Sequence, residues 1–245
     1  TDIDTHGTEV ATVIAGAFGN TYGAAGVAPD VDVLSVRVCA PAGCRSDAVA
    51  RGIIYAADAG ADVINLSLGG DENAVTADAV AYALGKGCVV VASAGNSGDT
   101  GNATEYPASY PGVLSVSAAA LDGTAAAWAE HNSDVDLTAP GEEIPAGQPA
   151  AQNYAYVAAS GTSFSAPQVS AAAALVRSVA PSATPAQVGT WLTSTASPRS
   201  SWPAGYGTGM LDVAAAVQAA TVMTPAPATP TIERRYRRVN PAPLF

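Results

Sequence analysis

Charged residues are scarce in this sequence, and basic residues are the scarcest. Only 13% of the 245 residues are charged, and 21 Asp and Glu against 10 Lys and Arg give a formal net charge of −11. Four of the ten basic residues are gathered near the end, between Arg234 and Arg238. The rest of the chain should therefore repel nucleic acids and anionic membranes, and we expect neither as a partner.

Long apolar runs are missing as well. No stretch of 18 consecutive apolar residues occurs, so the sequence predicts no membrane-spanning helix. The chain starts at Thr1 without the charged and then apolar segments of a secretory leader. We expect it to be part of a longer precursor, in which a membrane anchor beyond Phe245 stays an open alternative.

Cysteine is nearly absent, with three residues in all. Cys39 and Cys44 enclose a turn-forming Ala-Pro-Ala-Gly segment. One alternative is a small disulfide ring, which would add about 2–3 kcal/mol of stability and indicate an oxidising compartment, secreted or extracytoplasmic. The other is a metal-binding pair, for which no further Cys or His lies nearby. Cys88, within an apolar run, is predicted to be a buried thiol.

Carboxylate-rich loops with the spacing of calcium ligands are also lacking. We therefore predict no metal site and no cofactor, and a structural calcium ion is an alternative that no visible site supports.

What the sequence does contain is a regular alternation of apolar runs and helical patterns. Its length and its 49% hydrophobic content fit one large domain over residues 1–221. Residues 222–245 are predicted to be a Pro-rich linker and a basic tail. Short strands that alternate with helices indicate an α/β fold of three layers, with a mainly parallel central sheet flanked by helices. The predicted strands are 31–38, 63–67, 88–93, 113–118 and 135–138, and the predicted helices are 46–59, 74–85, 163–179, 186–195 and 212–220.

Only two histidines can serve as a general base. His6 opens a helical pattern that ends near Gly16, and a helix N-terminus disfavours the protonated imidazole. His6 is therefore able to accept a proton, although a purely structural role at a helix start fits the local sequence too. His131 has turn-forming polar neighbours and is predicted to lie in a solvated loop.

Two further residues are placed where an oxyanion could be bound. Ser163 stands at the head of a long Ala-rich helix, whose first N–H groups point at any anion formed there. The alternative is that Thr162 or Ser163 only caps this helix. Asn96 follows a buried strand on a Gly turn, where its amide can donate to an oxyanion or serve ordinary turn chemistry.

Together these motifs resemble those of the subtilisin-like serine proteases, in the same order along the chain. Within that family, the segments Tyr55–Asn65, Gly161–Phe164 and Ala174–Arg177 are most similar to those of the mycosins, membrane-anchored actinobacterial proteases of type VII secretion. The matching motifs are His6-Gly7-Thr8, Gly26-Val27-Ala28-Pro29, Asn65-Leu66-Ser67-Leu68-Gly69, Ala94-Gly95-Asn96, Ala139-Pro140-Gly141, Gly161-Thr162-Ser163 and Gly205-Tyr206-Gly207 with Asp212.

The resemblance implies a serine endopeptidase that acts on a peptide or protein substrate. It makes His6 the general base and Ser163 the nucleophile, and it places Asn96 with the Ser163 N–H in the oxyanion hole. It also implies an edge segment that pairs with the substrate backbone and a wall of the pocket for the side chain preceding the scissile bond. The edge segment is Ser67, Leu68 and Gly69, and the wall is Ala94 and Gly95.

Glu105 is the residue expected to set specificity. The Tyr106-Pro107 stretch aligns with a similar one in the family and puts Glu105 at the floor of that pocket, where broad-specificity relatives often have Gly. A carboxylate there should favour Lys or Arg. The alternative is that Glu105 turns to solvent and has no effect.

The catalytic aspartate of the family precedes the His by some 30–40 residues, and this chain starts five residues before His6. We assign the role to neither Asp2 nor Asp4. An α/β-hydrolase esterase is a poorer fit, because its nucleophile motif needs Gly where Ser165 stands and its His follows the Ser. The other alternative is a catalytically inactive, subtilase-like module that binds peptides or scaffolds a secretion complex.

Overall fold

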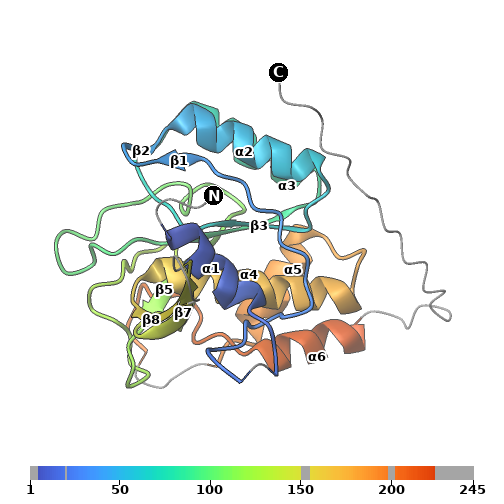
Figure 1. Ribbon diagram of the computed structural model, residues 1–245. Coiled ribbons are helices and arrows are strands. Elements are labelled where there is room, and N and C mark those ends of the chain that lie inside the picture. Colours follow the sequence, from blue (N-terminus) through green and yellow to red (C-terminus); the bar gives the residue numbers. More distant parts are fainter. Residues whose placement is uncertain (1–4, 20, 150–154, 198–201, 224–245) are drawn as a thin grey trace.

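The fold is built around a four-stranded parallel sheet, seen in a computed structural model that describes residues 5–19, 21–149, 155–197 and 202–223 (Figure 1). Its short, mostly apolar strands are buried on both faces, as expected for a parallel sheet covered by helices. The strands, in their spatial order, are β3 (Val63–Leu66), β4 (Val89–Ser93), β5 (Leu114–Ala119) and β6 (Leu137–Pro140).

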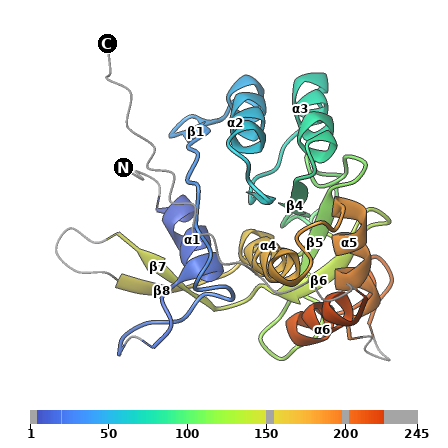
Figure 2. The same cartoon turned by 90° about the vertical axis from the view of Figure 1, so that its right-hand side faces the viewer.

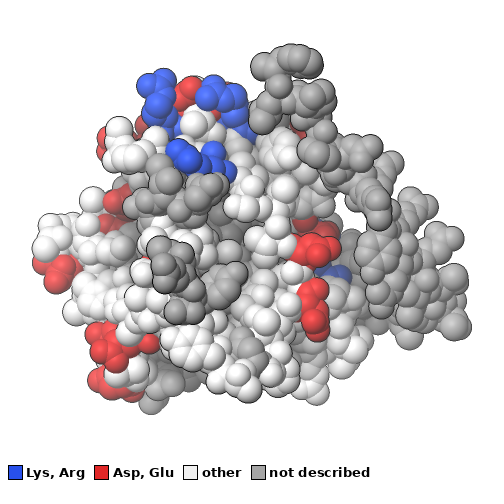
Figure 3. All heavy atoms as spheres, viewed as in Figure 1, with Lys and Arg blue, Asp and Glu red and all other residues white. Residues whose placement is uncertain are grey.

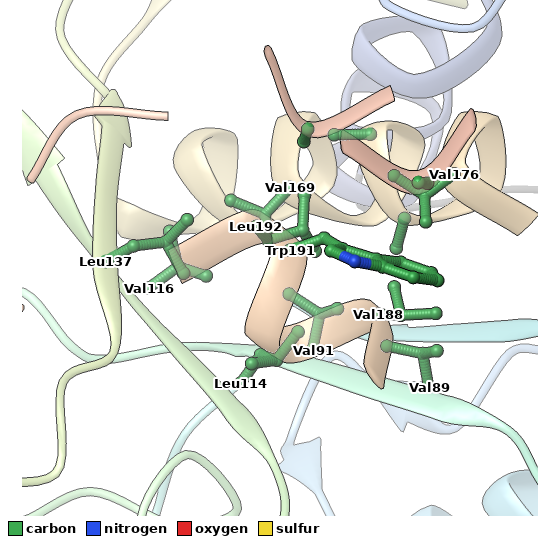
Figure 4. Close-up of a cluster of buried hydrophobic side chains, with 14 of the residues drawn as sticks. Val89, Val91, Leu114, Val116, Leu137, Val169, Val176, Val188, Trp191 and Leu192 are labelled. Atoms are coloured by element: carbon green, nitrogen blue, oxygen red, sulfur yellow. The ribbon is translucent and has the colours of Figure 1, made fainter. Parts of the chain in front are cut away.

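Helices cover both faces of this sheet (Figure 2). Alternate residues of β4 point to opposite sides, so Val89 and Val91 pack in one apolar cluster and Val90 in the other. The first cluster is centred on Trp191 and its aliphatic neighbours (Figure 4). The predicted three-layer α/β fold is therefore confirmed. One layer holds α2 (Ser46–Asp58) and α3 (Ala74–Gly85), and the other holds α4 (Thr162–Val179), α5 (Pro185–Ser194) and α6 (Val213–Met223).

A further helix and a hairpin lie beside the start of α4. Helix α1 (His6–Ala15) packs on α4 and on the antiparallel pair β7 (Ile144–Gln148) and β8 (Ala155–Ala159). Val10 and Phe164 are buried where these elements meet. This packing holds the N-terminus of α1 near that of α4.

The predicted strand 31–38 is wrong. The segment enters none of the described β-ladders, and Val33 and Leu34 are nearly half exposed. It runs instead along α2, where a Cβ on Gly52 would collide with the side chain of Val38. A run of apolar, β-branched residues becomes a strand only where a neighbouring strand completes its hydrogen bonds, and no described strand does so here.

Two smaller features also differ from the sequence-based expectations. His131 lies in a loop, as predicted, but it is only partly exposed, because its ring is stacked on that of Tyr206 with 4.8 Å between the centroids. Helix α6 continues to Met223, beyond the predicted domain end at residue 221, and the remainder of the predicted linker and basic tail lies outside the described residues. Among the helices that the structure describes, none combines the length and apolar character needed to span a membrane.

The segment between Cys39 and Cys44 forms a small hairpin. Strands β1 (Cys39–Ala40) and β2 (Gly43–Cys44) pair antiparallel, with the two cysteines opposite each other and joined by a disulfide. The third cysteine, Cys88, is 2% exposed, as its apolar neighbours predicted, and burial raises the pKa of its thiol. A ring of this kind is stable in an oxidising compartment.

We expect thiol counting on unreduced, denatured protein to find one free cysteine, Cys88, and three after reduction. The measurement is a titration with a chromogenic thiol reagent, followed by mass mapping of the alkylated positions. A Cys88→Ala variant is the matched control and should give no free thiol before reduction. Three free thiols in protein from an oxidising compartment would contradict the disulfide.

Candidate active site

Ser163 lies in the first turn of α4, where that helix has no side-chain cap. The N-cap position is held by Gly161 with φ 146°, a conformation that L-residues rarely adopt. The cap position belongs to Gly161 and not to Thr162 or Ser163, so the alternative that one of these two residues only caps the helix is wrong. Ser163 itself is half-buried. Its N–H is one of the first in the helix, which have no acceptor within the helix itself.

Asn96 is held at the same helix start by Thr162. Oδ1 of Asn96 accepts hydrogen bonds from the backbone N–H of Thr162 at 2.9 Å and from its hydroxyl at 3.0 Å. The Thr162 hydroxyl in turn accepts from the N–H of Gly95 at 3.2 Å. Two donors occupy Oδ1 of the exposed Asn96 amide, and no acceptor for its Nδ2 hydrogens lies among the residues that the structure describes, so Nδ2 is available to donate. Sequence reasoning assigned Thr162 at most a capping role and missed this contact.

The segment after β3 reaches Ser163 from the other side. The hydroxyl of Ser67 donates to the carbonyl oxygen of Ser163 at 2.8 Å. Asn65 donates to the Ser67 hydroxyl at 2.9 Å and accepts from Ser170 of α4, also at 2.9 Å. The backbone groups of residues 67–69 form no backbone hydrogen bond with the described chain, which leaves an edge for an added strand.

His6 approaches Ser163 through the contact of α1 with α4. Its ring lies edge-on to that of Phe164, the neighbour of Ser163, with 5.8 Å between centroids. Among the described residues no carboxylate forms an ion pair with His6. Glu9, one turn further along α1, accepts instead from Thr5 at 2.9 Å and from Gln148. Asp2 and Asp4 lie outside the described residues.

The predicted pocket residues also come together. A Cβ on Gly69 would overlap the carboxylate of Glu105, and a Cβ on Gly95 would come within 2.9 Å of the Glu105 Cγ. Ala94 is buried at the end of β4, and Leu68 packs into the cluster under α2 and α3. Glu105 is thus half-buried between the two predicted walls rather than turned to solvent. Burial raises the pKa of Glu105, and the backbone amide of Gly70 offsets part of that rise.

A second carboxylate, Glu130, was missed by the sequence reasoning. It is 0% exposed, and neither of its side-chain oxygens accepts a hydrogen bond from a described residue. Burial, and then the nearby charge of Glu105, raise the pKa of Glu130 to about 7. The only sequence signal is a Glu beside His131 in a polar stretch, which is indistinguishable from an ordinary turn.

Across the described residues, no group of three or more His, Cys, Asp or Glu side chains is arranged to hold a metal ion. The side chains around Ser163 suit nucleophilic chemistry. A hydroxyl at a helix N-terminus, a nearby imidazole and a free amide donor are the components of acyl transfer.

Comparisons with known proteins agree with this arrangement. Residues 1–209 match the subtilase family, peptidase S8. Subtilisin DY from Bacillus licheniformis is 38% identical over 222 residues, which cover 89% of this chain and 79% of that protein. Thermitase from Thermoactinomyces vulgaris is 42% identical over 175 residues, which cover 71% of this chain and 61% of thermitase.

Solved structures give the same result at the level of the fold. The crystal structure of MycP1 with its N-terminal propeptide removed has a TM-score of 0.76 and 32% identity, and covers 89% of this chain and 81% of MycP1. The chain therefore belongs to the subtilase family, and this membership supports serine endopeptidase activity in general.

Proposed function

We propose that the protein hydrolyses peptide bonds through an acyl-enzyme formed on Ser163, with His6 as the general base. The observation that carries this proposal is the pair of hydrogen bonds from Thr162 to Asn96, because they fix which end of the amide faces the start of α4. An amide donor and a helix N-terminus that converge beside a serine suit the oxyanion of acyl transfer.

The substrate backbone adds to the free edge of residues 67–69. His6 takes the proton of the Ser163 hydroxyl as Oγ bonds to the carbonyl carbon, and the carbonyl π electrons move to oxygen. Nδ2 of Asn96 and the N–H of Ser163 stabilise that oxyanion. His6 then gives its proton to the leaving amine as the C–N bond breaks, and water repeats the sequence on the acyl-enzyme.

The carboxylate that orients His6 is not assigned to a described residue. The resemblance to subtilisin-like proteases implies an aspartate after a strand that precedes His6, and we propose that the full-length protein supplies it. Within the described sheet, β3 pairs with β4 on one side only, so its other edge is open to such a strand. Loss of this residue alone lowers turnover by about 10⁴-fold in enzymes of this type.

The Cys39–Cys44 ring supports a secreted or extracytoplasmic location. The inactive-scaffold alternative has no observation in its favour, since a module without turnover has no chemical need for His6, Asn96 and Ser163 to be arranged in this way.

A fluorophosphonate probe tests the assignment of the nucleophile. We expect the full-length protein to be labelled covalently, with the adduct located on Ser163 by mass mapping. Ser163→Ala should abolish the labelling, whereas Ser165→Ala should retain it, because the buried Ser165 hydroxyl bonds to the carbonyl of Ala139. An adduct on another residue, or none on a folded protein, would refute the proposed mechanism.

A further inference from the structure

The side chains of two acidic residues, Glu105 and Glu130, lie against Gly95, the neighbour of Asn96. A Cβ on Gly95 would overlap Oε2 of Glu130 and would come within 2.9 Å of the Cγ of Glu105. Because Gly95 has no side chain, the side chains of Glu105 and Glu130 approach each other in the space that a Cβ would fill. Gly69 and Gly95 are predicted to border the substrate pocket, so Glu105 lies at that predicted pocket and the fully buried Glu130 lies beneath its surface.

Hydrogen bonds of its own N–H and carbonyl groups hold Glu130 in this position. Its N–H donates to the carbonyl of Gly95 at 3.0 Å, and its carbonyl accepts from the hydroxyl of Ser117 at 2.7 Å. Gly98 donates to the carbonyl of Trp128 at 3.0 Å, so the chain around Glu130 runs along the loop that carries Asn96. A buried carboxylate without a hydrogen-bond partner destabilises a fold. The position of Glu130 therefore indicates a role other than stability.

The described basic residues are all engaged elsewhere. Arg45 and Arg51 pair with Asp47, and Lys86 pairs with Asp58. The remaining two, Arg37 and Arg177, donate to backbone carbonyls. The largest group of basic side chains in view lies over β1 and α2 (Figure 3). No cation of the described chain pairs with the two acids, which leaves them available to a cationic group of a bound molecule.

We propose that Glu105 and Glu130 together select Lys or Arg as the substrate side chain preceding the scissile bond. Glu105, half-buried at the pocket, contacts the cation, and Glu130 stands behind it as a positioning residue that adds a second negative charge. The inference rests on the proposed function, since it assigns the acids to the pocket of that same peptidase site. A guanidinium suits the pair better than an ammonium, because its planar fork can bind a carboxylate with two parallel hydrogen bonds.

An organic cation fits these acids better than a metal ion. Calcium takes six to eight oxygen ligands, whereas two carboxylates converge here and the described residues form no larger cluster. Glu105 also lies against Gly95, whose neighbour Asn96 is bonded to the start of α4 beside Ser163, which is where the side chain of a bound substrate would arrive.

The second charge makes the selection dependent on pH. Glu105 is the charged group that faces Glu130, the backbone amide of Ser97 lies near it, and Asp71 faces Glu105 in turn. With its pKa raised to about 7, Glu130 is neutral in mildly acidic solution and becomes charged as pH rises through that value. A bound cation favours the charged form, so affinity for the cation should increase between pH 6 and pH 8.

The test measures binding without turnover, on full-length protein carrying Ser163→Ala. The probes are two N-acetylated product peptides that are identical except for a C-terminal Arg or its neutral isostere citrulline. Calorimetry at pH 6 and pH 8 gives both affinities. We expect the Arg peptide to bind about 10- to 100-fold more tightly than the citrulline peptide at pH 8, with about a tenfold smaller preference at pH 6.

Three variants on the Ser163→Ala background separate the contributions. Glu105→Gln should remove the preference for Arg at both pH values. Glu130→Gln should keep the pH 6 preference and lose its increase at pH 8, together with the proton release that accompanies Arg binding. Asp78→Asn makes the same change in charge on exposed α3 and should leave all affinities unchanged.

Equal binding of the Arg and citrulline peptides by folded protein would overturn the inference, as would a pH effect that persists in Glu130→Gln. So would calcium binding that depends on Glu130. None of these outcomes bears on the nucleophile, because labelling of Ser163 in the parent protein is measured independently of the pocket.

Discussion

Replacing Ser163 with alanine is expected to lower kcat for peptide hydrolysis by about 10⁶-fold in the full-length protein. The magnitude is the one established for subtilisin, a member of the same family. The hydroxyl of Ser163 forms the new bond to the carbonyl carbon. The neighbouring hydroxyls of Thr162 and Ser165 are buried and bonded to Asn96 and to the carbonyl of Ala139, so they do not replace it. The measurement is steady-state hydrolysis of a chromogenic peptide, with KM determined separately.

Ser178→Ala provides the matched control. It makes the same substitution at the exposed, opposite end of α4, where the hydroxyl bonds only to the carbonyl of Leu175. It should retain full activity, and both variants should unfold at wild-type temperature. If Ser163→Ala kept more than a small fraction of wild-type kcat, the acyl-enzyme would have to form elsewhere.

Replacing Asn96 with alanine should lower kcat by about 10²–10³-fold and leave KM nearly unchanged. The amide of Asn96 donates to charge that develops only in the transition state, so its loss does not weaken binding of the ground-state substrate. This range, too, comes from work on subtilisin. Asn96→Asp is nearly isosteric but cannot donate and adds a negative charge, so its kcat should be at least as low.

Substitutions of Thr162 test the same role of the Asn96 amide, with a smaller expected effect on kcat. Thr162→Val removes the hydroxyl that bonds to Oδ1 of Asn96 but keeps the backbone N–H that bonds there too. Its kcat should fall, but less than that of Asn96→Ala, and Thr162→Ser should restore most of it. The double variant should be no worse than Asn96→Ala, because the hydroxyl acts through the amide. A large rise in KM for Asn96→Ala would contradict the oxyanion role.

Elements with a clear apolar period could be predicted from the sequence, and elements that depend on a partner could not. Strand β4 and helices α2 and α3 lie within two residues of their predicted bounds. The hairpin of β7 and β8 was missed because Pro145 and Gly147 are unfavourable in strands, and only antiparallel pairing holds them there. The prediction of a strand at 31–38 is wrong for the opposite reason, since the segment has strand-forming residues but no described strand beside it.

The residues of the candidate site also differ in whether they could be predicted from the sequence. His6, Ser163 and Asn96 stand in local motifs, and the fold brings their elements to one place. Glu130 has no such motif. It reaches the pocket only because the chain near Trp128 pairs with the loop after β4, a contact between residues about 30 positions apart. Local sequence carries no information on that pairing.

The open start of α4 limits how far the protein can be stabilised without loss of its proposed activity. A capping Ser, Thr, Asp or Asn stabilises a helix by about 1 kcal/mol, yet the cap position holds Gly161. A side chain there would begin 3.5 Å from Nδ2 of Asn96, and its oxygen would compete for the N–H of Ser163 that the reacting carbonyl needs. The same donors cannot serve both the resting helix and the transition state, so the longest described helix stays uncapped at the end where the chemistry takes place.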